Sequence, residues 1–363
     1  MIFLGEASNL RGKTLKHLFA FGTKSDSNRL KSALATRYGS KEENVFLTAN
    51  GRSALCLALK NLVSKGSEVV LNGLTCQAVV IAIKSAGCVP VFADIEEKDL
   101  NYSEKTLNSL LNSHKNVKAF IIQNSLGNPV DIRPFEKLAK EKNLVLIEDL
   151  AHCTGRKYPD GREIGTVGDV AALSFGKGKS IDTITGGALI LKNPVKPLKF
   201  QSSRQSLSRT LRARWYPFFG ALLRACYKIH LNKPLVALLL KLHWIERSAD
   251  APLDLNSRLS HWQAKLALEQ LNSLEKNPGP LREFELVENR EELLKKLRKN
   301  GYIFDEIWYD VPVSPARYYK KSGFDEKSCP KTTEIAKKII NLPTWYKKED
   351  LKTAKKIIKE HEK

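Results

Sequence analysis

The feature that most constrains the fold is an alternation of short apolar runs with amphipathic stretches between residues 40 and 192. The predicted strands are EVVLNG (68–73), VPVFAD (89–94), KAFIIQN (118–124), LVLIED (144–149), VAALSF (170–175) and GALILK (187–192). The stretches 76–87 and 131–143 between them have helical periodicity. This alternation predicts an α/β fold with a mostly parallel sheet that helices cover on both faces.

The composition is that of a globular chain, with 42% hydrophobic and 27% charged residues among 363. The six cysteines are scattered without a CxxC pair, so we expect no disulfide framework and no metal site. The opening MIFLGEASNLRGK has too short an apolar patch for a secretory signal, and no run of about 18 apolar residues predicts a spanning helix. A cytoplasmic protein is the simplest expectation.

The net charge of +21 fits either a polyanionic partner or a surface that is merely rich in lysine. The sequence contains no zinc finger, no aromatic RNA-binding signature and no single basic block. We therefore expect no nucleic acid as a partner. Anionic small substrates and acidic membrane surfaces remain open as explanations of the charge.

The first stretch with candidate chemistry is NGRSALCLALKNL, residues 50–62. Asn50 and Gly51 interrupt the chain just before a strongly periodic helix. The N-terminus of such a helix presents free N–H groups and the positive end of its dipole, which suit a phosphate. The same residues also fit an ordinary helix cap, so the pattern leaves both interpretations open.

The second stretch is VLIEDLAHCTG, residues 145–155, where two carboxylates end a buried apolar strand. Burying them is costly unless a cationic group meets them. Because side chains alternate along a strand, Glu148 and Asp149 are expected to point to opposite faces, so only one faces a site. That carboxylate could cap a helix, bind a metal ion or pair with a protonated ring nitrogen.

The third stretch is ALSFGKGKSIDTITGGAL, residues 172–189, with Lys177 and Lys179 among small residues just after a strand. A lysine there can reach a carbonyl in a pocket and form a Schiff base, although both lysines could equally be solvated. Together, a phosphate cradle, an aspartate and a lysine are what pyridoxal 5'-phosphate requires. A dinucleotide would instead call for GxGxxG after the first strand, and none is present.

Several ordered motifs resemble those of one family. They are IEDLAH (147–152), GDVAALSFGKGK (168–179), GG (186–187), LNSRLSHWQAKLAL (255–268) and INLPTW (340–345). Over residues 30 to 355, apart from 201–250, the chain resembles the DegT/StrS sugar aminotransferases, which are fold-type I pyridoxal-phosphate enzymes. The resemblance implies a large domain with a mostly parallel seven-stranded sheet, and a small C-terminal α+β domain.

The resemblance also assigns the site residues. Lys179 corresponds to the Schiff-base lysine, because the family spacing is Ser-Phe, three residues, then lysine, and Lys177 falls where the family reserves no lysine. The cofactor contacts correspond to Gly51, Arg52, Ser53, Asp149, His152, Ser174 and, from the partner subunit, Asn256. Asn256 thereby implies a homodimer with shared sites. Arg258, together with Arg52, is a candidate contact to the substrate.

Two of the expected cofactor neighbours depart from the family pattern. Cys76 stands where many members place an aromatic residue that stacks on the cofactor ring. Asn124 takes a position often held by histidine. A weaker ring contact at Cys76, or a different ring neighbour, is therefore expected.

The activity implied by the resemblance is transfer of an amino group from an amino acid, expected to be L-glutamate, to a nucleotide-linked keto-sugar for surface polysaccharide or lipopolysaccharide. A related sugar dehydratase is an alternative, but those relatives have histidine where this chain has Lys179. A second alternative is a non-catalytic binding or regulatory protein of the same fold with a basic surface. Such a protein has no need of both Asp149 and Lys179.

The chain is expected to divide into four parts. They are a pyridoxal-phosphate-binding domain with an N-terminal arm (1–200), an apolar and basic helical insertion (201–250), a connecting helix with the partner-site segment (251–279), and a small α+β domain (280–363). The insertion has nine Lys or Arg against two Asp or Glu, and Pro217 and Pro234 are expected to split it into pieces too short to span a bilayer. It could rest on an anionic membrane surface, or pack on the main domain or a sister subunit.

Overall fold

The computed structural model describes residues 1–4, 19, 21–192, 198, 200, 202–227, 229–274, 278–304 and 307–361. Most of the predicted N-terminal arm lies outside these residues, as do residues 276 and 277 at the predicted break before the small domain.

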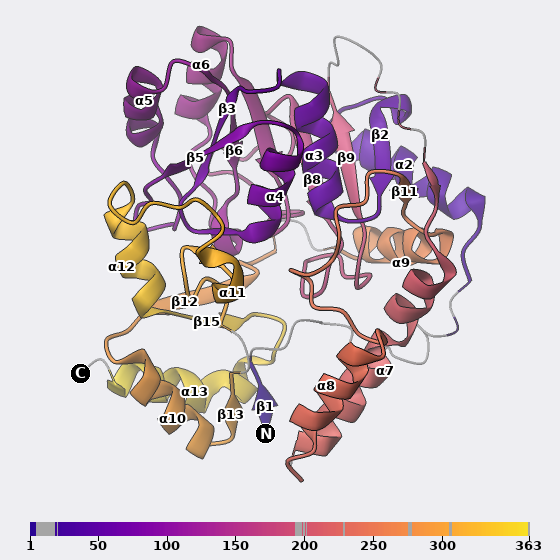
Figure 1. The fold of residues 1–363 in the computed structure, drawn as a ribbon, viewed down its shortest axis with the longest axis vertical. Helices are drawn as coiled ribbons and strands as arrows, with labels where there is room; N and C mark the ends of the chain where they lie inside the picture. Colours follow the sequence, from indigo (N-terminus) through magenta and orange to yellow (C-terminus); the bar gives the residue numbers. More distant parts are fainter. Residues whose placement is uncertain are drawn as a thin grey trace.

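A seven-stranded sheet forms the centre of the molecule, in the order β2-β9-β8-β7-β6-β3-β5 (Figure 1). Its strands are β2 (Val45–Thr48), β3 (Glu68–Asn72), β5 (Val89–Ala93), β6 (Val117–Ile122), β7 (Val145–Asp149), β8 (Val170–Ser174) and β9 (Gly187–Leu191). All neighbours pair in parallel except β9, which runs against both β8 and β2. The expected mostly parallel sheet is confirmed, and β2 is the one strand that the sequence patterns did not predict.

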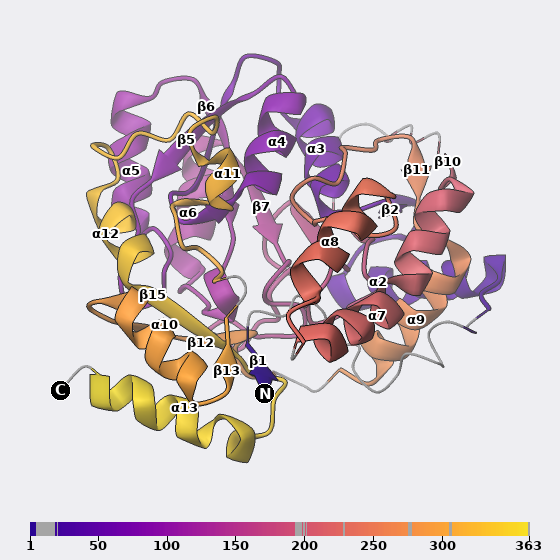
Figure 2. The same ribbon diagram turned by 60° about the horizontal axis from the view of Figure 1, so that its bottom comes forward.

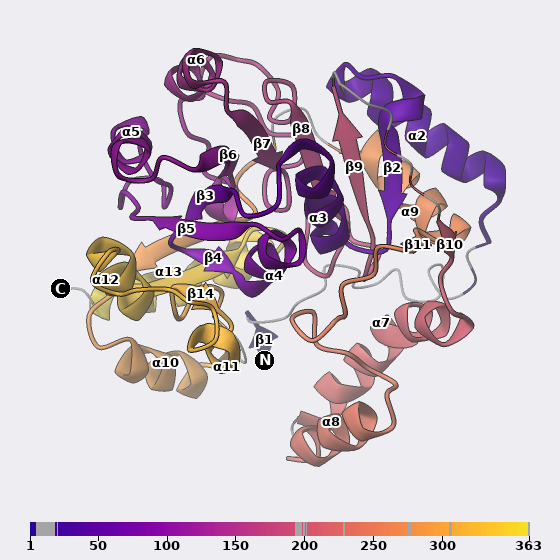
Figure 3. The ribbon, with the colours of Figure 1, turned by 45° about the horizontal axis from the view of Figure 1, so that its top comes forward.

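Helices cover both faces of this sheet (Figure 3). The covering helices are α3 (Gly51–Leu62) and α4 (Gln77–Ser85) on one face, and α2 (Lys24–Tyr38), α5 (Glu104–Ser113), α6 (Arg133–Lys142) and α9 (His261–Asn272) on the other. Strand side chains alternate between the two cores: Val69 and Leu71 pack with α3 and α4, whereas Val70 packs in the other core. The near-continuous apolar runs follow from this burial on both faces.

The loop between β7 and β8 is organised by the fully buried carboxylate of Glu148. The carboxylate accepts hydrogen bonds from the Tyr158 hydroxyl (2.8 Å) and from the N–H groups of Gly165 (2.7 Å), Val167 (2.9 Å) and Gly168 (2.6 Å). Four donors compensate the burial of this charge without a metal ion. As expected from strand alternation, Glu148 and Asp149 point to opposite faces, and only Asp149 is left for the cavity described below.

The C-terminal part has its own core, which packs below the large sheet in Figure 2. Its elements are β12 (Arg282–Leu286), α10 (Arg290–Lys299), β13 (Tyr302–Ile303), β14 (Val313–Ser314), α11 (Ala316–Tyr319), α12 (Pro330–Lys338), β15 (Ile339–Pro343) and α13 (Lys348–His361). Strand β12 pairs antiparallel with β15. The first residues, which we expected in the large domain, join this part instead: β1 (Ile2–Phe3) pairs with β13, and Leu4 is fully buried in the same core.

The remaining short elements are η1 (Glu42–Asn44), β4 (Thr75–Cys76), η2 (Ser125–Gly127), β10 (Ser203–Arg204) and β11 (Ser257–Arg258). Two of them tie distant parts of the chain together. Strand β4 pairs with β14 of the C-terminal part, and β10 pairs with β11 across the helical insertion.

The insertion forms two helices, α7 (Leu207–Tyr227) and α8 (Asn232–Lys241), which project from the body as a hairpin (Figures 1 and 3). The expected break at Pro217 is absent, because α7 continues through this residue. Pro234 lies in the first turn of α8, where a backbone N–H has no helical partner and proline is tolerated. Among the described residues, none of the helices has the length and apolar character needed to cross a membrane.

Candidate active site

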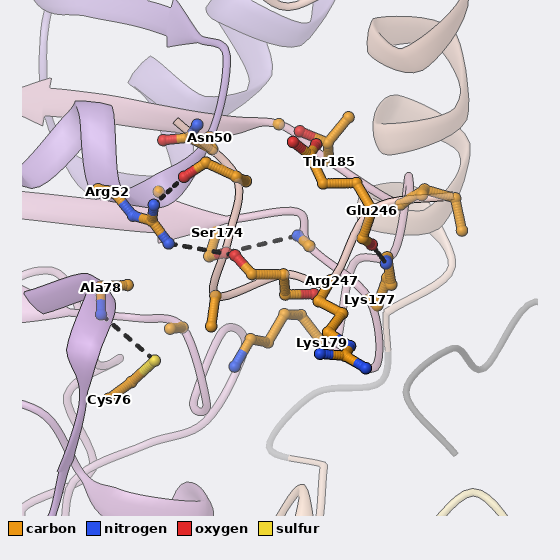
Figure 4. A pocket seen from close by; sticks show the side chains of 18 of the residues that line it. Asn50, Arg52, Cys76, Ala78, Ser174, Lys177, Lys179, Thr185, Glu246 and Arg247 are labelled. Carbon is orange, nitrogen blue, oxygen red and sulfur yellow. Dashed lines mark hydrogen bonds between the residues drawn. The ribbon is translucent and has the colours of Figure 1, made fainter. Parts of the chain in front are cut away.

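A cavity of about 260 Å³ opens at the carboxyl ends of β7 and β8 (Figure 4). Its lining comes from the N-terminus of α3, the ends of these two strands, the C-terminal part, and α7 with the segment that follows α8. The predicted site residues that line it are Gly51, Arg52, Cys76, Asp149, His152, Ser174 and Lys179. Parallel α/β sheets bind their ligands at this edge, so the cavity is the candidate active site.

The N-terminus of α3 faces the cavity from one side. Asn50 caps the helix, and its side-chain oxygen accepts a hydrogen bond from the N–H of Ser53 (2.8 Å). Gly51 packs directly on Ser174: a Cβ atom at Gly51 would lie 2.7 Å from the Cβ of Ser174. Only glycine allows the first turn of α3 to approach the hydroxyl at the end of β8 this closely.

Asp149 ends β7 with a buried carboxylate. Its Oδ1 accepts a hydrogen bond from the N–H of Ala151 (3.0 Å). Burial raises the pKa of Asp149 to about 6, although the Ala151 N–H and the positive charge of Lys179 both act to lower it. A carboxylate in this state is stabilised by any cation that enters the cavity.

Lys179 lies in the loop after β8, where its backbone N–H donates to the carbonyl of Gly176 (3.2 Å). Its amine lies 4.6 Å from the centre of the Trp308 ring. Burial lowers the pKa of Lys179 to about 8, a shift that the nearby carboxyl group of Asp149 partly opposes. About a tenth of the amine is therefore uncharged at pH 7, far more than for a lysine with a pKa of 10.5, and an uncharged amine is the nucleophilic form.

Lys177 has different surroundings, as Figure 4 shows. Its amine donates a hydrogen bond to the backbone carbonyl of Glu246 (2.6 Å) and lies 4.0 Å from the centre of the Tyr216 ring. Both neighbours belong to the helical insertion. The geometry therefore separates the two lysines of the loop, with Lys177 holding the insertion and Lys179 facing the aromatic residues of the C-terminal part.

His152 is buried between the large sheet and the C-terminal part. Its ring stacks on Trp308 at a centroid distance of 5.2 Å, and its Nδ1 accepts the N–H of Leu126 (3.1 Å). Burial, reinforced by the charges of Lys179 and Arg282, holds the pKa of His152 well below its usual range. The imidazole is therefore neutral, and because Nδ1 accepts, its proton is on Nε2.

Cys76, the departure from the family pattern, lies at the N-terminus of α4. Its sulfur accepts the N–H of Ala78 at 3.5 Å (Figure 4). The aromatic rings in the cavity come from elsewhere, because Trp308 and Tyr309 of the C-terminal part line it together with His152.

Arg52 and Ser53 are engaged by the segment that follows α8. The guanidinium of Arg52 donates to the carbonyl oxygens of Ala251 and Ser248, the latter at 3.1 Å. The hydroxyl of Ser53 lies 2.7 Å from the carbonyl oxygen of Asp254 and is absent from the cavity lining. The first turn of α3 therefore has two roles. It faces the cavity, and it holds the backbone of the segment after α8 by hydrogen bonds.

Three further predicted residues lie outside the lining. Asn124 is fully buried and supports the turn after β6, its side-chain oxygen accepting the N–H of Val130 (3.0 Å). Asn256 is exposed, and Arg258 belongs to the short strand β11. Asn256 was expected to serve the site of a partner subunit, so its exposure on a single chain leaves that expectation untested.

Several lining residues were not predicted. They are Trp308 and Tyr309 from the C-terminal part, and Arg209, Arg212 and Tyr216 from α7. The spacing of Arg209, Arg212 and Tyr216 is that of one helix face and was a usable signal. Trp308 and Tyr309 gave no local signal, because only the packing of the C-terminal part on the large sheet brings them to the cavity.

Comparison with known proteins agrees with this architecture. The model of the DegT/DnrJ/EryC1/StrS aminotransferase family matches residues 20–360. The chain belongs to this family. The chain is similar to the GDP-perosamine synthase of Escherichia coli O157:H7, which is 37% identical over 143 residues, 39% of this chain and 38% of that enzyme. A UDP-4-amino-4,6-dideoxy-N-acetyl-beta-L-altrosamine transaminase of Campylobacter jejuni is 33% identical over 167 residues, 46% of this chain and 43% of that enzyme.

Each of these curated relatives is thus matched over less than half of its length. The likeness of folds extends further. The putative sugar aminotransferase Spr1654 of Streptococcus pneumoniae superimposes with a TM-score of 0.71 over 98% of both chains at 18% identity. This family member therefore has the expected fold along nearly its entire chain.

Proposed function

We propose that this protein is a pyridoxal-phosphate-dependent aminotransferase that transfers an amino group from an amino acid, expected to be L-glutamate, to a nucleotide-linked keto-sugar. One observation carries the proposal. An amine of lowered pKa (Lys179), a buried carboxylate (Asp149) and the glycine-containing N-terminus of α3 line a single cavity. The names of the curated relatives, which are sugar transaminases and synthases, support the choice of substrate.

The cavity residues fit pyridoxal phosphate. The close approach of Gly51 to Ser174 brings backbone N–H groups and a hydroxyl together, as a phosphate requires. The raised pKa of Asp149 marks a buried carboxylate that gains from a cationic partner, and the protonated pyridine nitrogen is such a partner. Lys179 supplies an amine within electrostatic reach of Asp149.

When bound, the cofactor supplies an aldehyde that can be linked to an amine and a ring that accepts the electron pair left by proton abstraction. With the cofactor bound, Asp149 would hold the ring nitrogen in its charged form. Lys179 would hold the aldehyde through its amine, and the same amine, with a pKa of about 8, would accept and return the α-proton of the donor. His152 keeps Nε2–H as a hydrogen-bond donor because its imidazole is neutral.

The partner subunit has a part in this proposal. Asn256 is exposed on the single chain, which leaves it available to a neighbouring copy. We propose a homodimer in which Asn256 of each chain contacts the cofactor phosphate of the other. The nucleotide diphosphate of the acceptor would meet the basic side of the cavity, where Arg212 and Arg247 lie.

The experiment that tests this function uses the purified full chain with pyridoxal phosphate. The expected result is an absorbance band of the lysine-bound cofactor that borohydride fixes to Lys179, followed by transfer of labelled nitrogen from glutamate to a nucleotide keto-sugar. The matched variants are Lys179→Ala, which loses the band, and Lys177→Ala, which keeps it. Fixation at Lys177 would overturn the site, and failure with every keto-sugar of a panel would overturn the substrate class.

A further inference from the structure

The outer face of α7 is apolar and exposed. Its exposed large side chains are Leu207, Leu211, Trp215, Phe218 and Leu222. Their spacing of three or four residues places them in one stripe along the helix. Ala213 and Pro217, on another side of the helix, are buried, and Arg212 and Tyr216 line the cavity. One face of α7 therefore lines the cavity, and another face presents apolar side chains to the solvent.

Helix α8 and its flanking turns continue this surface. They expose Ile229, Leu231, Leu238, Leu242 and Trp244. Of the large hydrophobic side chains that are exposed in the described part of the chain, all but Met1, Phe19, Phe21 and Val89 belong to α7, α8 and their turns. An apolar concentration of this kind on one projecting element marks a contact surface.

Aromatic contacts hold the surface together. Trp215 packs edge-on against Phe218 at 5.7 Å, Phe218 against Phe219 at 5.7 Å, and Phe219 against Trp244 at 5.3 Å. Phe219 is buried between the exposed rings and so ties α7 to the end of α8. Two exposed tryptophans on a fixed apolar platform are suited to the interface between water and lipid, where indole rings prefer to lie.

The charge on the same element has one sign. Neither α7 nor α8 contains an Asp or Glu, while they carry Arg209, Arg212, Arg214, Arg224, Lys233 and Lys241. The contrast is with α13, whose lysines alternate with carboxylates and pair with them, as Lys356 does with Glu360 at 3.7 Å. The exposed amines of Lys233 and Lys241 lie on α8 beside the apolar side chains.

We infer that α7 and α8 form a docking surface for an anionic lipid bilayer, on which the hairpin lies with its apolar stripe in the headgroup region. Basic residues interleaved with Trp, Phe and Leu, without carboxylates, are complementary to anionic lipid. Arg209 and Arg212 line the cavity, so the exposed charges of this face are Lys233 and Lys241. A second copy of the chain would bring the same two lysines against this face, which like-charge repulsion opposes. Neither helix is long and apolar enough to span the bilayer, and the contact that we infer lies at its surface.

The geometry connects this surface to the cavity. Because opposite faces of α7 form the apolar stripe and part of the cavity wall, docking brings the cavity to within about 10 Å of the lipid, the diameter of one helix. The inference does not depend on the proposed function, since it rests only on the outer face of the hairpin.

The experiment is vesicle flotation of the full-length protein at low and high salt. Vesicles of phosphatidylcholine with phosphatidylglycerol are compared with vesicles of phosphatidylcholine alone. The expected result is flotation with the anionic vesicles, a blue shift of tryptophan fluorescence, and loss of binding at high salt. Equal binding to both vesicle types, or no binding at low salt, would overturn the inference.

Variants divide the apolar from the charged contribution. Lys233→Gln with Lys241→Gln is expected to lower partitioning onto anionic vesicles about thirtyfold. Trp215→Ser with Phe218→Ser is expected to lower it at least about tenfold. The matched controls are Lys352→Gln with Lys359→Gln on α13, and the exposed Val89→Ser, which leave partitioning unchanged.

Light scattering of the same variants tests the alternative that a second copy of the chain, rather than a bilayer, covers this surface. If Trp215→Ser with Phe218→Ser changes the molar mass in solution while vesicle binding by the wild type is absent, the surface is a subunit interface and the inference is wrong. The lysine variants keep the test informative should the aromatic pair fail to fold, because Lys233 and Lys241 are exposed.

Discussion

The candidate active site has two walls that are built differently. The sheet wall consists of Gly51, Asp149, His152, Ser174 and Lys179, which lie on or next to strands with fully buried cores on both faces. The hairpin wall consists of Arg209, Arg212, Tyr216 and the segment after α8. It is attached by a small buried apolar cluster, in which Ala213 of α7 packs with Trp262 and Leu266 of α9. Polar contacts add to it, such as Lys177 to Glu246 and the 2.5 Å ion pair between Arg209 and Asp254.

This difference suggests that the sheet wall binds the cofactor and the hairpin wall determines the acceptor. The groups that fit the cofactor are fixed by the most rigid part of the molecule, where small displacements are costly. The groups that would meet the acceptor belong to an element outside the sheet, which contacts the body through one small buried cluster and a few polar contacts. Family members that share the sheet wall can therefore differ in substrate, because their second wall is free to differ.

The largest expected effect comes from the sheet wall. In the proposed mechanism, Lys179→Ala would remove both the covalent link to the cofactor and the proton carrier, and it is expected to slow amino transfer at least about 10⁴-fold in a single-turnover assay. Lys177→Ala, the matched change in the same loop, is expected to remain active. Comparable losses from both variants would contradict the separate assignment of the two lysines.

The second effect concerns the carboxylate of the same wall. Asp149→Asn keeps the size and the hydrogen bond from Ala151, but it removes the charge that we propose to stabilise a protonated ring nitrogen. The rate is expected to fall about 10²- to 10³-fold, with the cofactor still bound. Glu148→Gln is the neighbouring comparison: it is expected to lower the free energy of unfolding rather than to change the chemistry. A normal rate in Asp149→Asn would remove Asp149 from the mechanism.

The third effect is a dependence of stability on pH in the protein without cofactor. The pKa of Lys179 is lowered from 10.5 to about 8, so the unfolded chain binds more protons than the folded one between these values. Wild type is expected to be less stable than Lys179→Met below pH 8, by roughly 3 kcal/mol, and this gap closes as the pH rises from 8 to 10.5. Urea unfolding of both proteins across this range measures it. A gap that does not change with pH would show that the amine is not buried as described.

The smallest effect tests the hairpin wall. Arg212→Ala is expected to raise KM for a nucleotide-linked acceptor about tenfold, while kcat and the half-reaction with the amino donor stay unchanged. Arg204→Ala, an exposed arginine outside the cavity lining, serves as the control. A fall in kcat from Arg212→Ala would mean that the two walls are less separate than their construction suggests.

The sequence predicted the sheet wall well for a physical reason. Strands buried on both faces read as apolar runs, and the residues at their ends are then brought together by the parallel arrangement itself. Strand β2 escaped prediction because it is only four residues long and lies at the edge of the sheet. The prediction of a helix break at Pro217 was wrong. The apolar side chains that α7 buries stabilise the helix by more than the loss of the one backbone hydrogen bond that proline cannot form.

The other half of the cavity depends on contacts between parts far apart in the sequence. Trp308 reaches His152 and Lys179 only through the docking of the C-terminal part, which no local pattern reports. The exposed stripe on α7 is visible in the sequence as a spacing. The spacing does not say whether these side chains face a core or the solvent. Only the position of α7 on the folded molecule shows this.

The pairing of β1 with β13 has a consequence for how the chain is made. Ile2 and Leu4 hydrogen-bond to the backbone of Gly301 and Ile303, and the carbonyl of Phe3 accepts the hydroxyl of Tyr346. Residues 2–4 leave the ribosome long before their partners exist, whereas the neighbouring strands of the large sheet can pair as they emerge. The C-terminal core can therefore close only after the large sheet has been synthesised, around a strand that has waited for its partners.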